Sequence, residues 1–252
     1  MSLIELRNVS KRFGRLIVLR DLTLKIDEGQ SIVIIGASGS GKSVMLKHIV
    51  GLLRPDSGEV FFDGERIDNL PEKRLSELRT NFGFLFQMGA LFDSLTVADN
   101  VAFPLVEHTH KDPEEIGRIV QEKLKMIGLP ESGPKMPGEL SGGQKKRVAL
   151  ARAIALAPRV ILYDEPTTGL DPIRSDVINE LIIKLQRELQ VTSITVTHDM
   201  QSAFKIADRI VMLYEGQLIF DGTPEEVRTT DEPIVKRFVL GEADEQELAT
   251  LR

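Results

Sequence analysis

The octapeptide GASGSGKS at residues 36–43 is the stretch whose residue types and spacing most directly indicate chemistry. It matches the pattern G-x-x-x-x-G-K-[ST], with the apolar run SIVIIG leading into it and a helical pattern after it. Glycines let successive backbone N–H groups converge on phosphate oxygens, and the start of the following helix adds its dipole. Lys42 would bring a positive charge to the β- and γ-phosphates of a nucleotide, and the Ser43 hydroxyl would be a ligand for Mg²⁺.

The alternative for this stretch is a glycine-rich turn with a chance lysine. The complete motif between a strand pattern and a helical pattern favours phosphate binding instead. The predicted nucleotide-binding residues of this loop are Gly36, Ala37, Ser38, Gly39, Ser40, Gly41, Lys42 and Ser43.

An acidic pair ends another apolar run, VILYDE at residues 160–165. In a chain with a phosphate loop, an aspartate at this position, here Asp164, predicts a ligand for Mg²⁺. Glu165 follows it and could orient the attacking water or accept its proton, so its removal should affect hydrolysis more than binding. The alternative is a solvated Asp-Glu pair at the end of a strand.

His198 and Gln87 each follow a further strand pattern, in TVTHD and FGFLFQ. His198 could donate a hydrogen bond to the γ-phosphate or to the attacking water, although a lone histidine is more often structural. Gln87 would be a surface glutamine on its own, but beside a phosphate loop it is a candidate contact to Mg²⁺ and the attacking water. The predicted catalytic residues are therefore Glu165, His198 and Gln87, and the predicted metal ligands are Ser43, Gln87 and Asp164.

The order of the elements is typical of an α/β protein. Apolar and β-branched runs alternate with helical patterns, which predicts a mainly parallel sheet. The predicted strands lie in LIELRNVSKRF, SIVIIG, GEVFFDG, NFGFLFQ, RVILYDE, TSITVTHD and RIVMLYEGQLIFDG, the last with a turn at Glu215-Gly216. One stretch has the spacing of an amphipathic helix, at Ile178, Leu181, Ile182, Leu185 and Leu189.

We expect a nucleotide-binding domain over residues 1–228 and a C-terminal tail over residues 229–252. Residues from about 96 to 157 are mainly helical, with turn signals at KDP and LPESGPKMPG, and predict a helical subdomain inserted into the sheet framework. The final GEADEQELATLR is charged and predicts a short helix or a loose tail.

Composition excludes several classes of function. The chain has 252 residues, of which 42% are hydrophobic, so it is long enough to bury a core. Its net charge of −6 argues against non-specific nucleic-acid binding, which needs a basic face. Without cysteine it has no disulfide and no cysteine metal site. The sequence has no apolar run of about 18 residues and no signal-peptide pattern, so we expect no membrane span.

The pentapeptide LSGGQ at residues 140–144 conflicts with helix propensity. Gly142 and Gly143 open what otherwise reads as a helix, at a cost of roughly 1 kcal/mol each relative to alanine. Ser141 and Gln144 fit a capping box, but a capping box does not require two glycines. Glycines expose backbone N–H groups and let a phosphate approach them closely, so the pair is typical of a phosphate contact.

Together, and in this order, these motifs resemble the nucleotide-binding subunit of ABC transporters over roughly residues 3–222. GASGSGKS resembles the Walker A motif, VILYDE the Walker B motif with its catalytic glutamate, and LSGGQ the signature. Gln87 resembles the Q-loop glutamine and His198 the switch histidine. Phe13 matches the aromatic residue that stacks on adenine, with a core phenylalanine as the alternative. Asp171, in the sequence GLD, matches the D-loop.

The resemblance implies an α/β P-loop NTPase fold, of the ABC type, with a mixed sheet, an inserted helical subdomain and a small antiparallel β region. It implies ATP and Mg²⁺ as cofactors. It also implies a head-to-tail homodimer in which the signature of one subunit faces the Walker A motif of the other, with Asp171 crossing between the two sites. ATP would favour the closed dimer and hydrolysis would let it open, a motion passed to a separate integral-membrane permease.

The segment after Gln87, with its GALF and DNVAFPL runs, resembles the ATPase of Mla-type (MCE-associated) phospholipid transporters. This resemblance implies a peripheral protein on the cytoplasmic face of the inner membrane. Its implied partners are the permease, an MCE-domain substrate-binding protein and a small regulatory subunit, without nucleic acid. A coupling helix of the permease would dock on a groove, about half of whose apolar candidates we expect in the core: Met88, Leu91, Phe92, Val97, Val101 and Phe103.

Other classes of function fit less well. Importers of polar amino acids more often carry an FNLF type of run after the Q-loop. ABC ATPases that act on DNA ends usually separate the two nucleotide motifs by a coiled coil, and residues 43–141 have no sustained heptads. ABC translation factors carry two cassettes and a basic linker. A structural module without turnover would not need Glu165 and His198.

Overall fold

The computed structural model describes residues 2–243 of the chain, which fold as two compact units. Among the described residues, the first unit consists of residues 2–68 and 196–243, and the second unit is residues 69–195. The division into residues 1–228 and 229–252 rests on motifs rather than on compactness, and it stays a prediction.

The first unit contains a small antiparallel sheet and part of a mixed sheet. Its elements, among the described residues, are β1 (Ser2–Phe13), β2 (Leu16–Asp27), β3 (Ser31–Ile35), α1 (Lys42–Ile49), β4 (Ser57–Phe62), β5 (Glu65–Arg66), α7 (Met200–Ile206), β9 (Arg209–Tyr214), β10 (Gln217–Gly222), α8 (Pro224–Thr229) and α9 (Pro233–Leu240). The antiparallel sheet has the order β2-β1-β4-β5. The predicted small antiparallel region is therefore confirmed.

The strand that leads to the phosphate loop lies in the mixed sheet. β3 pairs with β9 in parallel, and β9 pairs with β10 antiparallel. All five residues of β3 are buried, as its unbroken apolar run predicts. β9 and β10 are joined at Glu215 and Gly216, whose φ angles of 46° and 80° are those of a tight hairpin turn. The predicted strands and their turn are confirmed here.

The second unit is built on a parallel pair of strands covered by helices. Its elements are α2 (Glu72–Arg79), β6 (Phe82–Leu85), α3 (Val97–His108), α4 (Pro113–Met126), the 3₁₀ helix η1 (Pro137–Glu139), α5 (Gly142–Ala153), β7 (Val160–Asp164), α6 (Pro172–Leu189) and β8 (Thr192–Val196). Its strands have the order β8-β7-β6. On α6, the residues of the predicted apolar face that are buried are Ile178, Leu181, Ile182 and Leu185.

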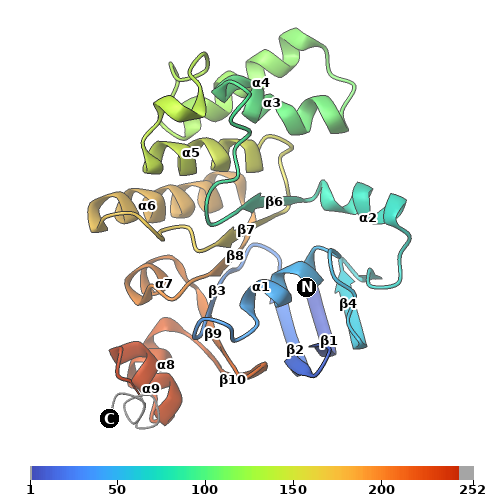
Figure 1. Cartoon of the computed structure of the whole chain (residues 1–252), viewed down its shortest axis with the longest axis vertical. Helices are drawn as coiled ribbons and strands as arrows, with labels where there is room; N and C mark the ends of the chain where they lie inside the picture. The colour runs from blue at the N-terminus through green and yellow to red at the C-terminus, as the bar shows by residue number, and fades with distance from the viewer. Residues whose placement is uncertain (1, 244–252) are drawn as a thin grey trace. The chain divides into compact units, whose positions relative to one another are not determined.

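Helices α3, α4 and α5 pack together in the second unit, and α6 lies alongside α5 (Figure 1). They occupy the stretch in which the sequence predicts a helical subdomain, whose limits of about 96–157 stay a prediction. Within residues 2–243, no helix is long and apolar enough to cross a membrane. Residues 244–252, the greater part of the predicted charged tail, lie outside the described residues.

Candidate functional site

The phosphate loop connects β3 to α1, and its backbone requires glycine at two positions. Gly36 has a φ of 149° and Gly41 a φ of 107°, values that residues with a side chain rarely adopt. A Cβ atom on Gly36 would lie 2.2 Å from the carbonyl oxygen of Leu213, and one on Gly41 would lie 2.9 Å from that of Val18. These two glycines therefore let the loop lie directly against the backbone of β9 and β2.

Lys42, the first residue of α1, is buried and bonded to the loop itself. Its Nζ donates hydrogen bonds to the carbonyl oxygens of Gly36 at 2.7 Å and Ala37 at 2.9 Å. No side chain caps α1, whose N-cap residue is Gly41, and its first turn holds no acidic residue. The positive end of α1 therefore has no capping side chain or first-turn carboxylate to compete with a phosphate.

Two serines of the loop also suit a phosphate or a metal ion. Ser40 Oγ is buried and has no hydrogen-bond partner among the described residues. A buried hydroxyl without a partner is uncommon, so Ser40 has bonding capacity to offer a ligand. Ser43 is exposed at the start of α1, where its hydroxyl can reach an incoming group.

His198 belongs to the same unit as the phosphate loop. The buried Thr197 donates a backbone hydrogen bond to the carbonyl oxygen of Ile34 in β3, at 3.2 Å. The chain after β8 therefore runs beside the end of β3 that leads into the loop. His198 is exposed at this place, and Asp199 after it caps α7. The structure thus brings His198 and residues 36–43 to the same end of β3.

Phe13 ends β1 in the first unit. Its side chain is 48% exposed, so the alternative of a core phenylalanine is wrong. Lys11 lies on the same side of the strand, with its Nζ 5.7 Å from the centre of the Phe13 ring. The exposed ring has a free surface on which a flat base can stack.

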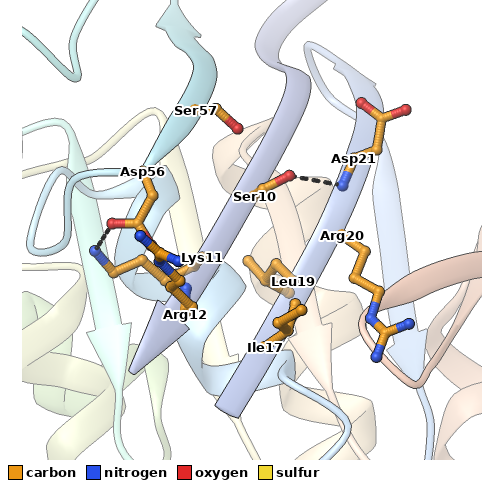
Figure 2. A pocket seen from close by; sticks show the side chains of 9 residues that line it. All are labelled: Ser10, Lys11, Arg12, Ile17, Leu19, Arg20, Asp21, Asp56 and Ser57. Atoms are coloured by element: carbon orange, nitrogen blue, oxygen red, sulfur yellow. Dashed lines mark hydrogen bonds and ion pairs between the residues drawn. The ribbon is translucent and has the colours of Figure 1, made fainter. Parts of the chain in front are cut away.

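A cavity of about 430 Å³ opens beside β1 and β2. Figure 2 shows Lys11 in this cavity paired with Asp56, and the backbone N–H of Asp21 bonded to Ser10 Oγ. None of the predicted site residues lines the cavity. We therefore assign it no part in nucleotide chemistry.

The second unit brings Gln87, Asp164 and Glu165 to one edge of its sheet. β6 and β7 are parallel, with Leu85 opposite Tyr163, so Gln87 and Glu165 each lie two residues beyond a paired position. Ligands in open α/β sheets bind at the carboxyl ends of the strands, which is where these side chains are. Asp164 is half-buried and Gln87 is exposed.

Glu165 begins a tight turn that continues to Thr168. Its φ of 51° is in the left-handed region, which is unfavourable for a residue with a long side chain. Thr168 donates from its backbone N–H to the Glu165 carbonyl oxygen at 3.3 Å, and from its hydroxyl to Glu165 Oε2 at 3.1 Å. Lys146 of α5 donates to the carbonyl oxygens of Glu165, Pro166 and Thr168, at 3.3, 2.7 and 2.8 Å. These bonds hold the turn in shape.

The signature residues form the start of α5. Ser141 donates from its backbone N–H to Gln144 Oε1 at 2.9 Å and accepts from the Gln144 N–H at 3.4 Å, so the capping box is present. Neither Gly142 nor Gly143 has a positive φ. The atoms nearest to an added Cβ would be 3.9 and 3.8 Å away, which is ordinary contact. The fold of this chain therefore does not require glycine at either position, which favours a role in contacting another molecule.

Asp171 has partners within its own unit. It is the N-cap of α6, where its Oδ1 accepts from the backbone N–H of Arg174 at 2.9 Å. Its other oxygen forms an ion pair with Arg174 Nε at 3.2 Å. Capping explains the aspartate locally, and its role between two subunits stays a prediction.

We expect replacement by alanine to affect stability differently at Gly36, where the backbone requires glycine, and at Gly142, where it does not. Gly36→Ala should lower the free energy of unfolding by about 1–3 kcal/mol, because the backbone there is strained for alanine. Gly142→Ala should leave it unchanged or raise it by up to about 1 kcal/mol, because alanine is the better helix former. Denaturant unfolding of the two purified variants measures both, and equal destabilisation would contradict this difference.

Three residues near the site were not predicted from the sequence: Lys146, Thr168 and Arg152. Arg152 of α5 donates hydrogen bonds to the carbonyl oxygens of Gly89 and Ala90, at 2.9 and 2.8 Å. Because Lys146 holds the Glu165 turn, α5 contacts both the turn and the segment that follows Gln87. The predicted site residues thus fall into two groups, with residues 36–43, His198 and Phe13 in the first unit and the others in the second.

Comparison with known proteins gives several close matches. Residues 19–168 match the family model described as ABC transporter. The intermembrane phospholipid transport system ATP-binding protein MlaF of Haemophilus influenzae is 43% identical over 96% of this chain and 92% of its own. The probable ribonucleotide transport ATP-binding protein mkl of Mycobacterium leprae is 45% identical over 94% of this chain and 69% of its own.

The fold is also similar to that of solved ATP-binding cassettes. One is the dimeric structure of a post-hydrolysis state of the cassette MJ0796, bound to ADP and Pi. It superposes with a TM-score of 0.80 at 37% sequence identity, over 88% of this chain and 98% of that one.

Proposed function

The chain belongs to the ABC transporter family of ATPases, and we propose that it powers phospholipid transport across or between bacterial envelope membranes. In this proposal residues 1–228 are the nucleotide-binding domain, with a helical subdomain at about 96–157, and residues 229–252 are a tail. The likeness to MlaF carries the choice of cargo, because it extends over 96% of this chain and 92% of the relative.

The proposed nucleotide site uses the phosphate loop as its binding element. Residues 36–43 would bind the phosphates of ATP, with the Lys42 ammonium exchanging its two carbonyl partners for phosphate oxygens. The exposed ring of Phe13 would stack on adenine. Mg²⁺, bound with ATP, would neutralise phosphate charge. Ser43, Gln87 and Asp164 would hold it through oxygen atoms, which suit a hard cation.

The proposed hydrolytic residues have distinct roles. Glu165 would orient the attacking water and accept its proton, and Thr168 would fix the direction of the carboxylate through the bond to Oε2. His198 would donate a hydrogen bond to the γ-phosphate, as its exposed place beside the end of β3 supports. Gln87 would contact the water from the neighbouring strand.

We further propose that two copies of the chain share two ATP sites. The signature residues Ser141, Gly142, Gly143 and Gln144 of one copy would contact the γ-phosphate held by the other, and Asp171 would cross between the sites. The room for a side chain at both glycines supports this, since no atom among residues 2–243 would be crowded by an added Cβ atom there. Only the closed dimer would complete the phosphate contacts, so ATP would favour closure.

The proposed assembly works at the cytoplasmic face of the inner membrane. Its other components would be an integral-membrane permease, an MCE-domain protein and a small regulatory subunit. A second candidate cargo is a ribonucleotide, because the mycobacterial mkl protein is 45% identical to this chain. Coverage favours the phospholipid, since the chain matches 92% of MlaF but 69% of mkl.

Purification of the intact complex in mild detergent tests the cargo. We expect bound phospholipid, and ATP-dependent transfer of labelled phospholipid to acceptor vesicles. A parallel assay measures ribonucleotide uptake into vesicles that contain the complex. Uptake of ribonucleotides without phospholipid transfer, or co-purification of a periplasmic amino-acid-binding protein, would contradict the proposal.

A second cavity, of about 450 Å³, offers a docking place for the permease in the second unit. Five aromatic residues line it, namely Phe82, Phe84, Phe86, Phe92 and Phe103. Of the six apolar residues predicted for the groove, Val97 and Val101 are buried in the core, Leu91 is half-buried, and Met88, Phe92 and Phe103 are exposed. A groove with exposed aromatic rings fits the apolar face of a partner helix.

The rim of this cavity is already ordered in the free chain. Asn100, fully buried in α3, accepts from the backbone N–H of Phe92 at 2.9 Å. Its Nδ2 donates to the carbonyl oxygens of Phe92, Leu95 and Thr96 at 3.0–3.2 Å. The rings of Phe92 and Phe103 have centroids 4.7 Å apart. A partner would therefore meet a formed surface and would not have to order this loop.

We expect Phe103→Glu to release the chain from the permease while leaving the hydrolysis rate of the isolated chain within about twofold. The introduced carboxylate would lose its water on docking, which is costly in a cavity lined mainly by aromatic rings, although Arg152 also lines it. Val106→Glu is the matched control, because Val106 is 60% exposed on the same helix and does not line the cavity. Co-purification with a tagged permease measures both variants. Equal retention of the two would exclude this cavity as the docking place.

A further inference from the structure

Lys146 is a charged residue placed where the fold of α5 would favour an apolar one. Its side chain is 6% exposed, and its neighbours Val148, Ala149 and Leu150 are fully buried. Burying an ammonium group is costly unless its charge is balanced and its donors are bonded. The adjacent Lys145 is only half-buried, so one lysine of the pair faces solvent and the other the interior.

The bonds of Lys146 all go to one short turn. An ammonium group has three N–H donors, and three carbonyl oxygens receive them, those of Glu165, Pro166 and Thr168. The Glu165 carboxylate adds an attractive charge on the same side. These contacts lie nineteen to twenty-two positions away in the chain, so local helix formation does not account for them.

The turn needs such support because its first residue is strained. Glu165 has a φ of 51°, a conformation that is costly for a non-glycine residue and persists only where the surrounding structure holds it. The bonds that hold the turn include the two from Thr168 to Glu165, the three from the Lys146 ammonium, and one from the backbone N–H of Leu170 to the carbonyl oxygen of Thr167 at 3.1 Å. Without the ammonium, the Pro166 carbonyl oxygen would be buried without this partner.

We propose that Lys146 is a positioning residue for hydrolysis, which fixes the Glu165 turn from the signature helix and so sets the direction of the Glu165 carboxylate. This inference rests on the proposed role of Glu165 as the residue that activates water. Helix α5 would then have two roles. Its N-cap residue Ser141 would contact the partner's nucleotide, and its Lys146 would hold the Glu165 turn. A shift of α5 on nucleotide contact would then reach Glu165 directly through Lys146.

The charge of Lys146 depends on pH within an accessible range. Burial lowers its pKa to about 8, and Glu165 opposes this shift. Lys145 and Arg147 flank it on α5, and no charged group of α3, α4, α6 or β6 among residues 2–243 contributes to the shift. As the pH rises through about 8, the ammonium loses a proton and one of its three donors. Hydrolysis that depends on the turn should therefore fall.

Stability should change in the opposite direction. Between pH 8 and the ordinary lysine value of 10.5, the unfolded chain binds more protons at this group than the folded chain does. The contribution of Lys146 to the free energy of unfolding therefore rises with pH in this interval. If Lys146 only supported the fold, activity would not fall while stability rises with pH. Measuring both therefore separates a positioning role from a structural one.

The test compares the full chain with Lys146→Met and Lys146→Arg, using Mg²⁺ and ATP from pH 6.5 to 9.5. We expect Lys146→Met to lower kcat about 10–100-fold at pH 7, the size expected for hydrogen bonds to a charged group, and to leave KM within about twofold. The advantage of the wild type over Lys146→Met should shrink above pH 8. Lys146→Arg, which stays charged, should keep its activity across this range.

Lys123→Met is the matched control. Lys123 is 7% exposed on α4 and pairs with Glu122 at 2.8 Å, so the substitution removes another buried lysine away from the turn. We expect the kcat and pH profile of this variant to equal those of the wild type. A ratio of wild-type to Lys146→Met activity that stays constant with pH, or equal losses in Lys123→Met, would overturn the proposal. Differential scanning fluorimetry of the same samples measures how stability changes with pH. The expected rise in stability can be checked on the wild type even if a variant does not fold.

The Glu165→Gln variant distinguishes this proposal from the one on which it rests. If Glu165→Gln hydrolyses ATP as the wild type does, the proposed role of Glu165 fails and that of Lys146 fails with it. If Glu165→Gln is inactive but Lys146→Met keeps the wild-type kcat and pH profile, only the positioning role fails.

Discussion

We expect Glu165→Gln to lower the rate of ATP hydrolysis by about 10²–10⁴-fold, the usual contribution of one general base, and to leave ATP binding intact. Glutamine keeps the size of the side chain and can still accept from the Thr168 hydroxyl, so the turn should keep its shape. The variant should accumulate as an ATP-bound dimer. Sizing chromatography with light scattering, with and without ATP, measures the dimer, and phosphate release measures the rate.

Glu131→Gln is the control for this variant, because Glu131 is an exposed carboxylate elsewhere in the same unit. It should hydrolyse ATP at the wild-type rate and form no trapped dimer. Wild-type hydrolysis by Glu165→Gln would show that another group activates the water. Loss of ATP binding in this variant would instead mean that the carboxylate contributes to binding ATP rather than to activating water.

We expect mixed dimers of Lys42→Ala and Ser141→Arg chains to trap nucleotide at about half the wild-type level. If the signature acts on the partner's nucleotide, such a dimer contains one intact site and one doubly damaged site. If the signature acts within its own chain, both sites are damaged. Nucleotide trapping in dimers purified through two different tags measures the occupancy.

A second substitution separates the phosphate contact from the cap. Ser141 is the N-cap of α5, so Ser141→Arg also removes a cap, at a cost of about 0.5–2 kcal/mol. Ser141→Asp keeps a capping side chain but places a negative charge where the phosphate would lie, and should give the same half occupancy. Trapping no higher than in either parental variant would contradict a shared site.

The regular strands of this fold could be predicted from sequence where burial leaves an unbroken apolar run. β3 and β7 are such strands, and both were predicted. β2 was not, because its pattern slips in the middle. Leu22 and Leu24 are buried in a regular alternation, but Leu19 is also buried and lies three positions before Leu22. Asp21, between Leu19 and Leu22, has a φ of 48°. An irregular residue of this kind shifts the alternation by one, so a period of two no longer fits the whole strand.

The site could be predicted where a motif has its own local geometry. The phosphate loop and the capping box of LSGGQ are of this kind. The loop joins a strand to a helix as predicted and the capping box is present, whereas the binding roles of both stay predictions. The contacts of Lys146 and Arg152 could not be predicted, because each joins α5 to a loop that is distant in sequence. The spacing of Lys146 to Ala149 and Leu150 does place it on a buried side of the helix, but its partners depend on tertiary packing.

The two bonds from the Lys42 ammonium to its own loop have a consequence for the subunit between turnovers. A buried cation that is bonded to two carbonyl oxygens of its own loop helps to fix the conformation of that loop. In the proposed site, binding and loss of phosphate would exchange one set of acceptors for another, which would reduce the net gain on binding. Release of product would benefit from the same exchange, since the carbonyl oxygens of Gly36 and Ala37 could accept from the ammonium again as ADP leaves.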